Sequence, residues 1–372
     1  MSGFGLRALK KEVKEKHQDD SRLYFDHIVV GDDYIAALKY LELNRKYPDQ
    51  TVRLVSSNIL NKQSIENEFK CMISTVRSEK AAASLVDKSA RLEVTPIDNE
   101  PVFYKDTKLH SFSGRAKPHE QMEDEEFFQS SYSTYNWESL FAQFDIEDLD
   151  TELLKTQFNK YIDKLEVATP EDLVEKVNFK VFTSEYETFE CEHLHWCKSP
   201  KAFYKLIANK NDLGDSLHKY CNKLESRTSL TVHFEAQGEE FYDSFGTVFL
   251  PQSVTHEWGH FICDIEKYDP ATETQEMTAL MFVTEEITSE EDLGKKIRLM
   301  KRVIERVFSK FAKSDVKEFI NYRIDSFIKG HDDTLMDKIQ TEHSELHFYG
   351  EGAPLGEDKS DVLYTPRAIL SL

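Results

Sequence analysis

Residues 23–57 constrain the fold most tightly, because a buried strand, a glycine, a helix and a second strand follow one another within them. Residues 25–30 form the short apolar run of a strand that is covered on both faces. Gly31 interrupts this run, and leucine and isoleucine then recur at helical spacing over residues 35–43. A second apolar strand occupies residues 51–55. This order predicts a βαβ unit, the opening of a dinucleotide-binding domain.

The turn of this unit matches the dinucleotide fingerprint G-x-G-x-x-G/A only in part. Its three defining positions hold Gly31, Asp33 and Ala36, with Asp32 between the first two. Asp33 places a carboxylate where the pyrophosphate should lie, and like charges at short range are unfavourable in a poorly solvated site. Ser56 stands where an acidic residue should hold a ribose hydroxyl. The pattern therefore indicates a retained architecture with eroded cofactor contacts, and any α/β domain that begins with a glycine turn is the alternative.

Bulk properties limit the class of protein. The 372 residues suffice for two or three domains, and the net charge of -21 argues against nucleic-acid or anionic-membrane partners. Five cysteines in a long chain indicate a reducing compartment. No apolar run approaches the roughly 20 residues that cross a bilayer. We therefore predict a cytoplasmic protein without a transmembrane segment, with an amphipathic extension over residues 1–21.

Hydrophobic periodicity gives the remaining elements. Three- and four-residue spacing predicts helices over residues 148–165, 199–207, 289–311 and 316–328. Ser289 is the expected N-cap of the longest of them. Alternation and apolar runs predict strands within residues 103–113, 178–196, 230–250, 256–268 and 277–285. The sequence contains neither a G-x-S-x-G elbow nor a phosphate loop ending in Gly-Lys-Ser/Thr, so serine hydrolase and NTPase functions lack support.

A short apolar strand near the carboxyl end, residues 346–349, runs into Gly350-Glu351-Gly352. This segment resembles the carboxyl-terminal flavin-binding segment of the amine oxidase and protoporphyrinogen oxidase-like flavoproteins. Gly31, Ala36, Gly350 and Glu351 match motif positions, and the order of elements along most of the chain is similar to that family. Asp33 and Ser56 depart from its pattern, and these departures concern flavin binding more than the fold.

The resemblance implies an α/β fold with an FAD/NAD(P)-binding, Rossmann-like domain and an inserted antiparallel-sheet α+β substrate domain. The nucleotide-binding domain would comprise residues 22–100, 150–225 and 335–372, and the substrate-type domain residues 101–149 and 226–334. The resemblance also implies FAD as the cofactor of an amine oxidase-like oxidoreductase that moves a hydride from a small-molecule substrate to the flavin. No catalytic residue is indicated. A degenerate relative that binds another ligand or a protein partner is the second interpretation. The cofactor positions that the resemblance implies are Gly31, Asp32, Asp33, Ala36, Ser56, Gly350, Glu351 and Gly352.

A competing motif lies at residues 256–260, a literal H-E-x-x-H. On a helix, His256 and His260 would share a face and bind zinc, with Glu276 as third ligand and Glu257 as general base of a metallopeptidase. On a strand, the two imidazoles would lie roughly 13 Å apart, too far for one metal ion. The strands expected on either side favour the strand interpretation over the helix.

A second group of metal-binding residue types alternates along the strand expected at residues 187–196. Cys191, His193, His195 and Cys197 are spaced two apart, so adjacent members share a face. The pattern leaves two interpretations open. One is a metal-binding pair, and the other, which we favour, is a partly buried strand whose side chains make polar contacts.

Overall fold

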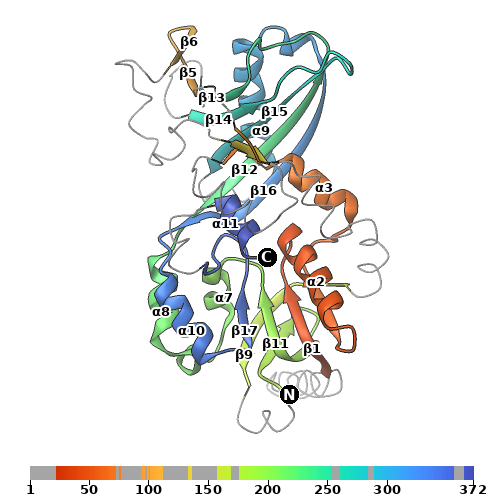
Figure 1. Ribbon diagram of the computed structural model, residues 1–372, viewed down its shortest axis with the longest axis vertical. Coiled ribbons are helices and arrows are strands. Elements are labelled where there is room, and N and C mark those ends of the chain that lie inside the picture. The colour runs from red at the N-terminus through yellow and green to blue at the C-terminus, as the bar shows by residue number, and fades with distance from the viewer. Residues whose placement is uncertain are drawn as a thin grey trace, which may run out of the picture.

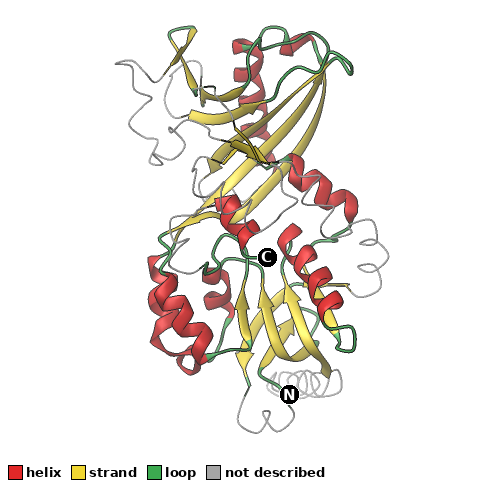
Figure 2. Ribbon diagram, in the orientation of Figure 1, coloured by secondary structure: helices red, strands yellow, loops and turns green. Residues whose placement is uncertain are grey.

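The computed structural model describes residues 22–72, 75–76, 94–96, 99, 101–111, 133–135, 157–168, 176–253, 260–283, 289–355 and 364–372. Figures 1 and 2 show two parts, each built on its own large sheet, with the long strands β12 and β16 reaching from one part to the other. Among the described residues, no helix is long and apolar enough to span a membrane.

The first sheet has the strand order β8-β2-β1-β11-β10-β9, and β17 lies beside β11. Strands β1, β2, β8, β11 and β17 are mutually parallel, whereas β9 and β10 form an antiparallel extension. The parallel strands β1, β11 and β17 therefore end at one edge, which brings the turns after Val30, Trp196 and Phe348 together. The strands span Arg22–Val30 (β1), Val52–Ser56 (β2), Gln157–Asn159 (β8), Ile162–Val167 (β9), Phe179–Thr183 (β10), Thr188–Trp196 (β11) and Leu346–Phe348 (β17).

Helices cover both faces of this sheet, as expected for strands that are apolar on both sides. One apolar core joins the sheet to α2 and α11, and a second joins it to α7, α8 and α10. Gly31 makes the close approach possible, because a Cβ there would lie 2.6 Å from the Cβ of Ala36 and 2.9 Å from that of Cys197. The helices span Tyr34–Lys46 (α2), Lys62–Lys70 (α3), Pro200–Leu206 (α7), Gly214–Lys223 (α8), Asp333–Glu342 (α10) and Tyr364–Leu370 (α11), with a 3-10 helix at Lys210–Leu213.

The second sheet is almost wholly antiparallel, with the order β16-β12-β15-β14-β13-β5-β6. Helix α9, Glu290–Val307, packs Met300, Val303 and Ile304 into the core of this part. The strands span Val102–Lys105 (β5), Lys108–Ser111 (β6), Glu225–Gln237 (β12), Gly246–Pro251 (β13), His260–Ile265 (β14), Thr274–Val283 (β15) and Asp315–Lys329 (β16). A small sheet joins β3, Thr75–Val76, to β7, Ser133–Tyr135, and β4, Val94–Pro96; a 3-10 helix covers Phe311–Lys313.

The structure confirms the predicted α/β class and corrects two helices. Residues 157–159 and 162–165, expected within a helix over 148–165, belong to β8 and β9, and residues 316–328, expected in a second helix, belong to β16. β16 pairs with β12 along most of its length, and this long-range pairing outweighs the helix-like spacing of its apolar residues. The helix expected at 289–311 is confirmed, with Ser289 capping α9. The strand expected at 256–268 is confirmed over 260–265; residues 1–21 and 254–259 lie outside the described residues.

A candidate ligand cavity between the two sheets

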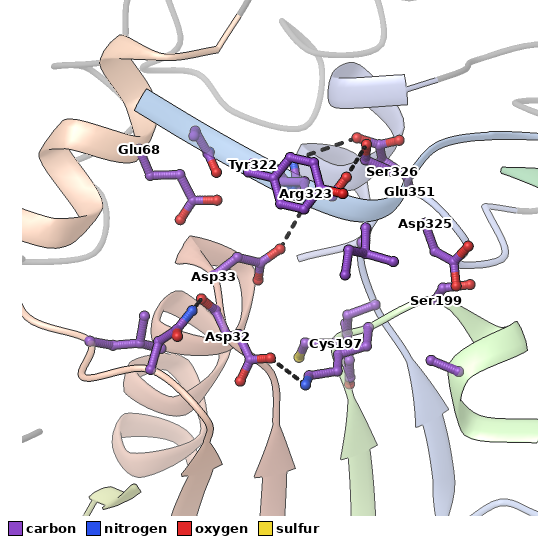
Figure 3. A pocket seen from close by; sticks show the side chains of 18 of the residues that line it. Asp32, Asp33, Glu68, Cys197, Ser199, Tyr322, Arg323, Asp325, Ser326 and Glu351 are labelled. Carbon is purple, nitrogen blue, oxygen red and sulfur yellow. Dashed lines mark hydrogen bonds and ion pairs between the residues drawn. The ribbon is translucent and has the colours of Figure 1, made fainter. Parts of the chain in front are cut away.

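A cavity of about 670 Å³ lies where the turns of the first sheet face strand β16 of the second. Figure 3 shows carboxylates from both sides of the cavity with Arg323 between them. The lining residues come from the turn after β1, from α3 and the loop before it, from the turn after β11, from the turn after β17, and from β16. The cavity therefore collects the ends of segments that are far apart in the sequence.

The amide groups at the start of α2 are bonded to the chain's own carboxylates. Asp33 is the N-cap of α2, and its side chain accepts a hydrogen bond from the Ala36 amide at 3.4 Å. Glu68 of α3 accepts a hydrogen bond from the Tyr34 amide at 2.9 Å. Free amides at a helix N-terminus are the groups that bind phosphate in dinucleotide-binding domains. Here two of these donors already have carboxyl groups of the chain itself as partners.

Arg323 of β16 links these carboxylates to the turn after β17. Its Nη2 atom lies 3.0 Å from Asp33 Oδ2, and its Nη1 atom lies 3.7 Å from Glu351 Oε1. The other oxygen of Glu351 accepts a hydrogen bond from the Ile328 amide at 3.1 Å. One guanidinium therefore connects the opening turn and the carboxyl-terminal turn of the first sheet to the second sheet.

The cluster around Arg323 contains three carboxyl groups and one guanidinium. Burial raises the pKa of each of the three acids. Burial, reinforced by the charge of Asp33, raises the pKa of Glu68 to about 8. Burial also raises the pKa of Asp33 and of Glu351, although Arg323 acts against it in both. Burial opposes the charge of Arg323, but the three surrounding carboxylates outweigh it and raise its pKa above the ordinary value. A proton is therefore retained among these groups near neutral pH.

Asp32, in the turn after β1, forms hydrogen bonds with the residues at the end of β2. Its Oδ1 atom accepts hydrogen bonds from the Ser57 amide at 2.6 Å and from the Ser56 hydroxyl at 3.2 Å, and its Oδ2 atom forms an ion pair with Lys198. Burial opposes ionisation, but Lys198 and the hydrogen bonds from Ser57 lower the pKa of Asp32 below its usual value. An ionised Asp32 thus engages the position where a ribose hydroxyl would be recognised.

The structure brings the expected cofactor positions together at this one edge. Five of them line the cavity: Asp32, Asp33, Gly350, Glu351 and Gly352. Gly31, Ala36 and Ser56 lie among the buried residues around the turn, and a Cβ at Gly352 would lie 2.3 Å from Pro200 Cδ. Sequence reasoning did not identify Glu68, Lys198 or Arg323. Of these three, only Lys198 could be predicted from the sequence, because it follows a predicted strand that ends at the same edge of the first sheet.

The structure does not support the zinc interpretation of the H-E-x-x-H motif. His260 begins β14 and pairs with Pro251, whereas Glu276 pairs with Glu235 on β12. Ile265 lies opposite Met277, so Glu276 is displaced from His260 by about 20 Å along the hairpin, six residues at the strand rise. His256 and Glu257 lie outside the described residues.

The alternating residues of β11 lie beside further histidines. His193 stacks on His27, and His195 stacks on His347 with ring centroids 4.8 Å apart. His195 Nε2 lies 3.0 Å from His27 Nδ1, and its Nδ1 lies 3.3 Å from the Tyr349 hydroxyl. Burial, and then the neighbouring imidazoles, keep the pKa of His195 well below its usual value. These contacts favour the interpretation as a strand with polar contacts over that of a metal-binding pair.

Comparison with known proteins gives a likeness of fold. No family model and no curated protein sequence matches this chain. Solved structures do match: wild-type putrescine oxidase bound to putrescine has a TM-score of 0.52 and 10% identity, covering 94% of this chain and 97% of its own. An oxidoreductase from Methanosarcina mazei has a TM-score of 0.51 and 9% identity, covering 94% and 98%. The chain therefore shares the fold of these structures, a Rossmann-like α/β domain joined to a second domain built on a mostly antiparallel sheet.

Proposed function

We propose that this protein is an amine oxidase-like scaffold that no longer holds FAD at its dinucleotide turn, and that its cavity binds a small ligand without phosphate groups. The carrying observation is that Asp33 and Glu68 accept hydrogen bonds from the first amides of α2. These are the donors that a pyrophosphate requires. The residues present therefore do not fit FAD in the pose that this type of fold implies.

The electrostatic argument points in the same direction. A pyrophosphate at the turn would bring two negative charges beside the carboxyl groups of Asp33, Glu68 and Glu351, which share the one cation Arg323 and already retain a proton near neutral pH. Like charges a few ångströms apart in a partly desolvated site repel by several kcal/mol at an effective dielectric constant of about 20. Displacing the carboxylates instead would break their hydrogen bonds to α2. A neutral or cationic ligand would not be repelled by the cluster and would not need to displace its carboxyl groups.

The organisation of the chain supports a ligand site of this kind. We assign residues 22–100, 150–225 and 335–372 to the nucleotide-type domain, and residues 101–149 and 226–334 to the substrate-type domain, with the cavity between them. A cytoplasmic location agrees with five unpaired cysteines, all of which are buried. We infer no redox step, because the reacting group of such a step would be the flavin.

The rival function is that of an active FAD-dependent, amine oxidase-like oxidoreductase. It is favoured by the extent of the fold likeness, which covers nearly the whole chain. It would require Asp33 and Glu68 to release the α2 amides when the cofactor binds.

The absorption spectrum of the full-length protein, purified from cells supplied with riboflavin, separates the two functions. We expect no visible flavin band, and no flavin in the supernatant of denatured protein by mass spectrometry. We also expect thermal stabilisation by a phosphate-free compound in a ligand screen, and none by FAD, FMN or NAD. A yellow protein with one FAD per chain would refute the proposal and establish the rival.

A further inference from the structure

A side-chain cluster on the second sheet, separate from the cavity residues, carries a second inference. We propose that His233, Glu235 and Glu276 bind one divalent transition-metal ion, for which Zn²⁺ is the best match. One ligand atom from each residue lies within 4.8 Å of the other two. Glu235 and Glu276 are direct cross-strand partners on β12 and β15, and His233 shares their face because it precedes Glu235 by two residues. Figure 1 shows these two strands side by side.

A hydrogen bond at Nδ1 orients the imidazole of His233. Its Nδ1 atom lies 2.9 Å from the Thr278 hydroxyl, and that hydroxyl donates its proton to the carbonyl oxygen of Lys70 at 3.3 Å. When the hydroxyl proton goes to Lys70, Nδ1 is the donor to Thr278. In that tautomer Nε2 is the nitrogen that can bind a metal ion. Orientation of a ligating imidazole by a hydrogen bond at its other nitrogen is the usual arrangement at metal sites.

The lone pair of Nε2 faces a carboxylate oxygen. Nε2 lies 3.3 Å from Glu276 Oε2 and has no hydrogen-bond partner among the described residues, although the side chain is only 4% exposed. In that tautomer both atoms are acceptors, and a metal ion between them would bind both. The separation exceeds the 2.7–2.9 Å typical of a charge-assisted N–H···O bond. It equals the distance of about 3.3 Å between two ligands of a tetrahedral zinc ion with bonds of about 2.0–2.1 Å.

Three acidic residues and two lysines surround the cluster, which has a route of entry for an ion. The amide of Glu266 donates a hydrogen bond to the carbonyl oxygen of Glu276 at 2.9 Å, so a third acidic residue lies next to the cluster. The Glu276 side chain is 40% exposed, so the site opens to solvent on that side. Lys70 and Lys317 form ion pairs with Glu235. A bound metal would compete with these lysines for one carboxylate. Three protein ligands leave a fourth position for water.

The test is a zinc titration of the full-length protein, stripped of metal with a chelator and dialysed, followed by calorimetry and by competition with a chromophoric chelator. We expect one Zn²⁺ per chain. Glu276→Gln and His233→Asn should each weaken binding by at least about tenfold. The asparagine amide keeps the bond to Thr278 while removing the ligand nitrogen. Lys70→Gln should tighten binding, because it frees Glu235.

Two control variants define the outcomes that would overturn this inference. Glu225→Gln alters an exposed carboxylate on the same strand, and His256→Ala alters the H-E-x-x-H motif; both should leave zinc affinity unchanged. The inference fails if the protein binds no zinc, if Glu276→Gln and His233→Asn bind as tightly as the wild type, or if only His256→Ala loses binding. Circular dichroism of each variant tests whether the fold is kept. Because the Glu276 side chain is partly exposed and His233 is buried, Glu276→Gln is the decisive variant.

Discussion

Replacing Arg367 with methionine is expected to lower the free energy of unfolding by about 3–5 kcal/mol, the usual cost of breaking a buried ion pair. Arg367 is fully buried, and its Nη2 atom lies 2.5 Å from Asp333 Oδ1. Its Nε atom also donates to the carbonyl oxygen of Ala353 at 2.8 Å. The side chain thereby ties α11 to α10 and to the turn that contains Gly350. Methionine would fill much of the space but leave the Asp333 carboxylate buried without its counter-ion.

Urea denaturation of the two proteins, followed by circular dichroism, measures this loss. The matched control is Lys338→Met on α10, whose ion pair with Glu342 is largely exposed. Exposed pairs contribute little, so the control should change the unfolding free energy by less than about 1 kcal/mol. An Arg367→Met protein as stable as this control would show that the buried pair does not hold the carboxyl-terminal segment in place.

Replacing Glu68 with glutamine is expected to stabilise the protein at pH 8 and to leave stability near pH 4.5 little changed. The pKa of Glu68 is raised from 4.5 to about 8 in the folded protein. Between these values the folded state binds more protons at Glu68 than the unfolded state does, so the free energy of unfolding falls as pH rises. The shift sets an upper limit of about 5 kcal/mol on this contribution, at roughly 1.4 kcal/mol per pH unit. Glutamine carries no charge and can still accept from the Tyr34 amide.

Urea denaturation at a series of pH values between 4.5 and 8 tests this expectation through the difference between the wild type and Glu68→Gln. The control is Glu66→Gln, on the same helix but outside the cavity lining. The difference should grow with pH for Glu68→Gln and stay flat for the control. A constant difference across this range would mean that Glu68 titrates normally. It would also mean that the carboxylate cluster around Arg323 does not lower the free energy of unfolding.

Local signals in the sequence were sufficient where local interactions decide the structure. Helix α9 has a serine cap and an apolar stripe on one face, and both act within the helix itself. The turns at Gly31 and Gly350 were located because each follows a short apolar strand. The apolar residues of strand β16 also suit a helical period, so the sequence alone predicts a helix there. The pairing of β16 with β12, which begins 90 residues earlier, depends on contacts that no local window contains.

In the candidate site, too, a local motif identifies some residues, whereas long-range contacts bring the others into place. Asp33 could be recognised as a misfit because the fingerprint defines its position, whereas its partner Arg323 is 290 residues away along the chain. Glu68 lies on a helix without any motif, and its role arises only because α3 places it against the first amide of α2. Glu276 was grouped with His256 and His260 by spacing alone. The sheet register places it beside His233 instead.

The central claim is that Asp33 and Glu68 occupy the α2 amides to which the pyrophosphate of FAD would bind. A titration with FAD tests this claim most directly. The wild type and an Asp33→Gly/Glu68→Gln double variant are titrated side by side, with quenching of flavin fluorescence as the signal. The double variant restores the second glycine of the fingerprint and removes the charge at the Tyr34 amide. We predict no saturable binding by the wild type and measurable binding by the double variant. Tight binding of one FAD per wild-type chain, unchanged or weakened in the double variant, would contradict the account.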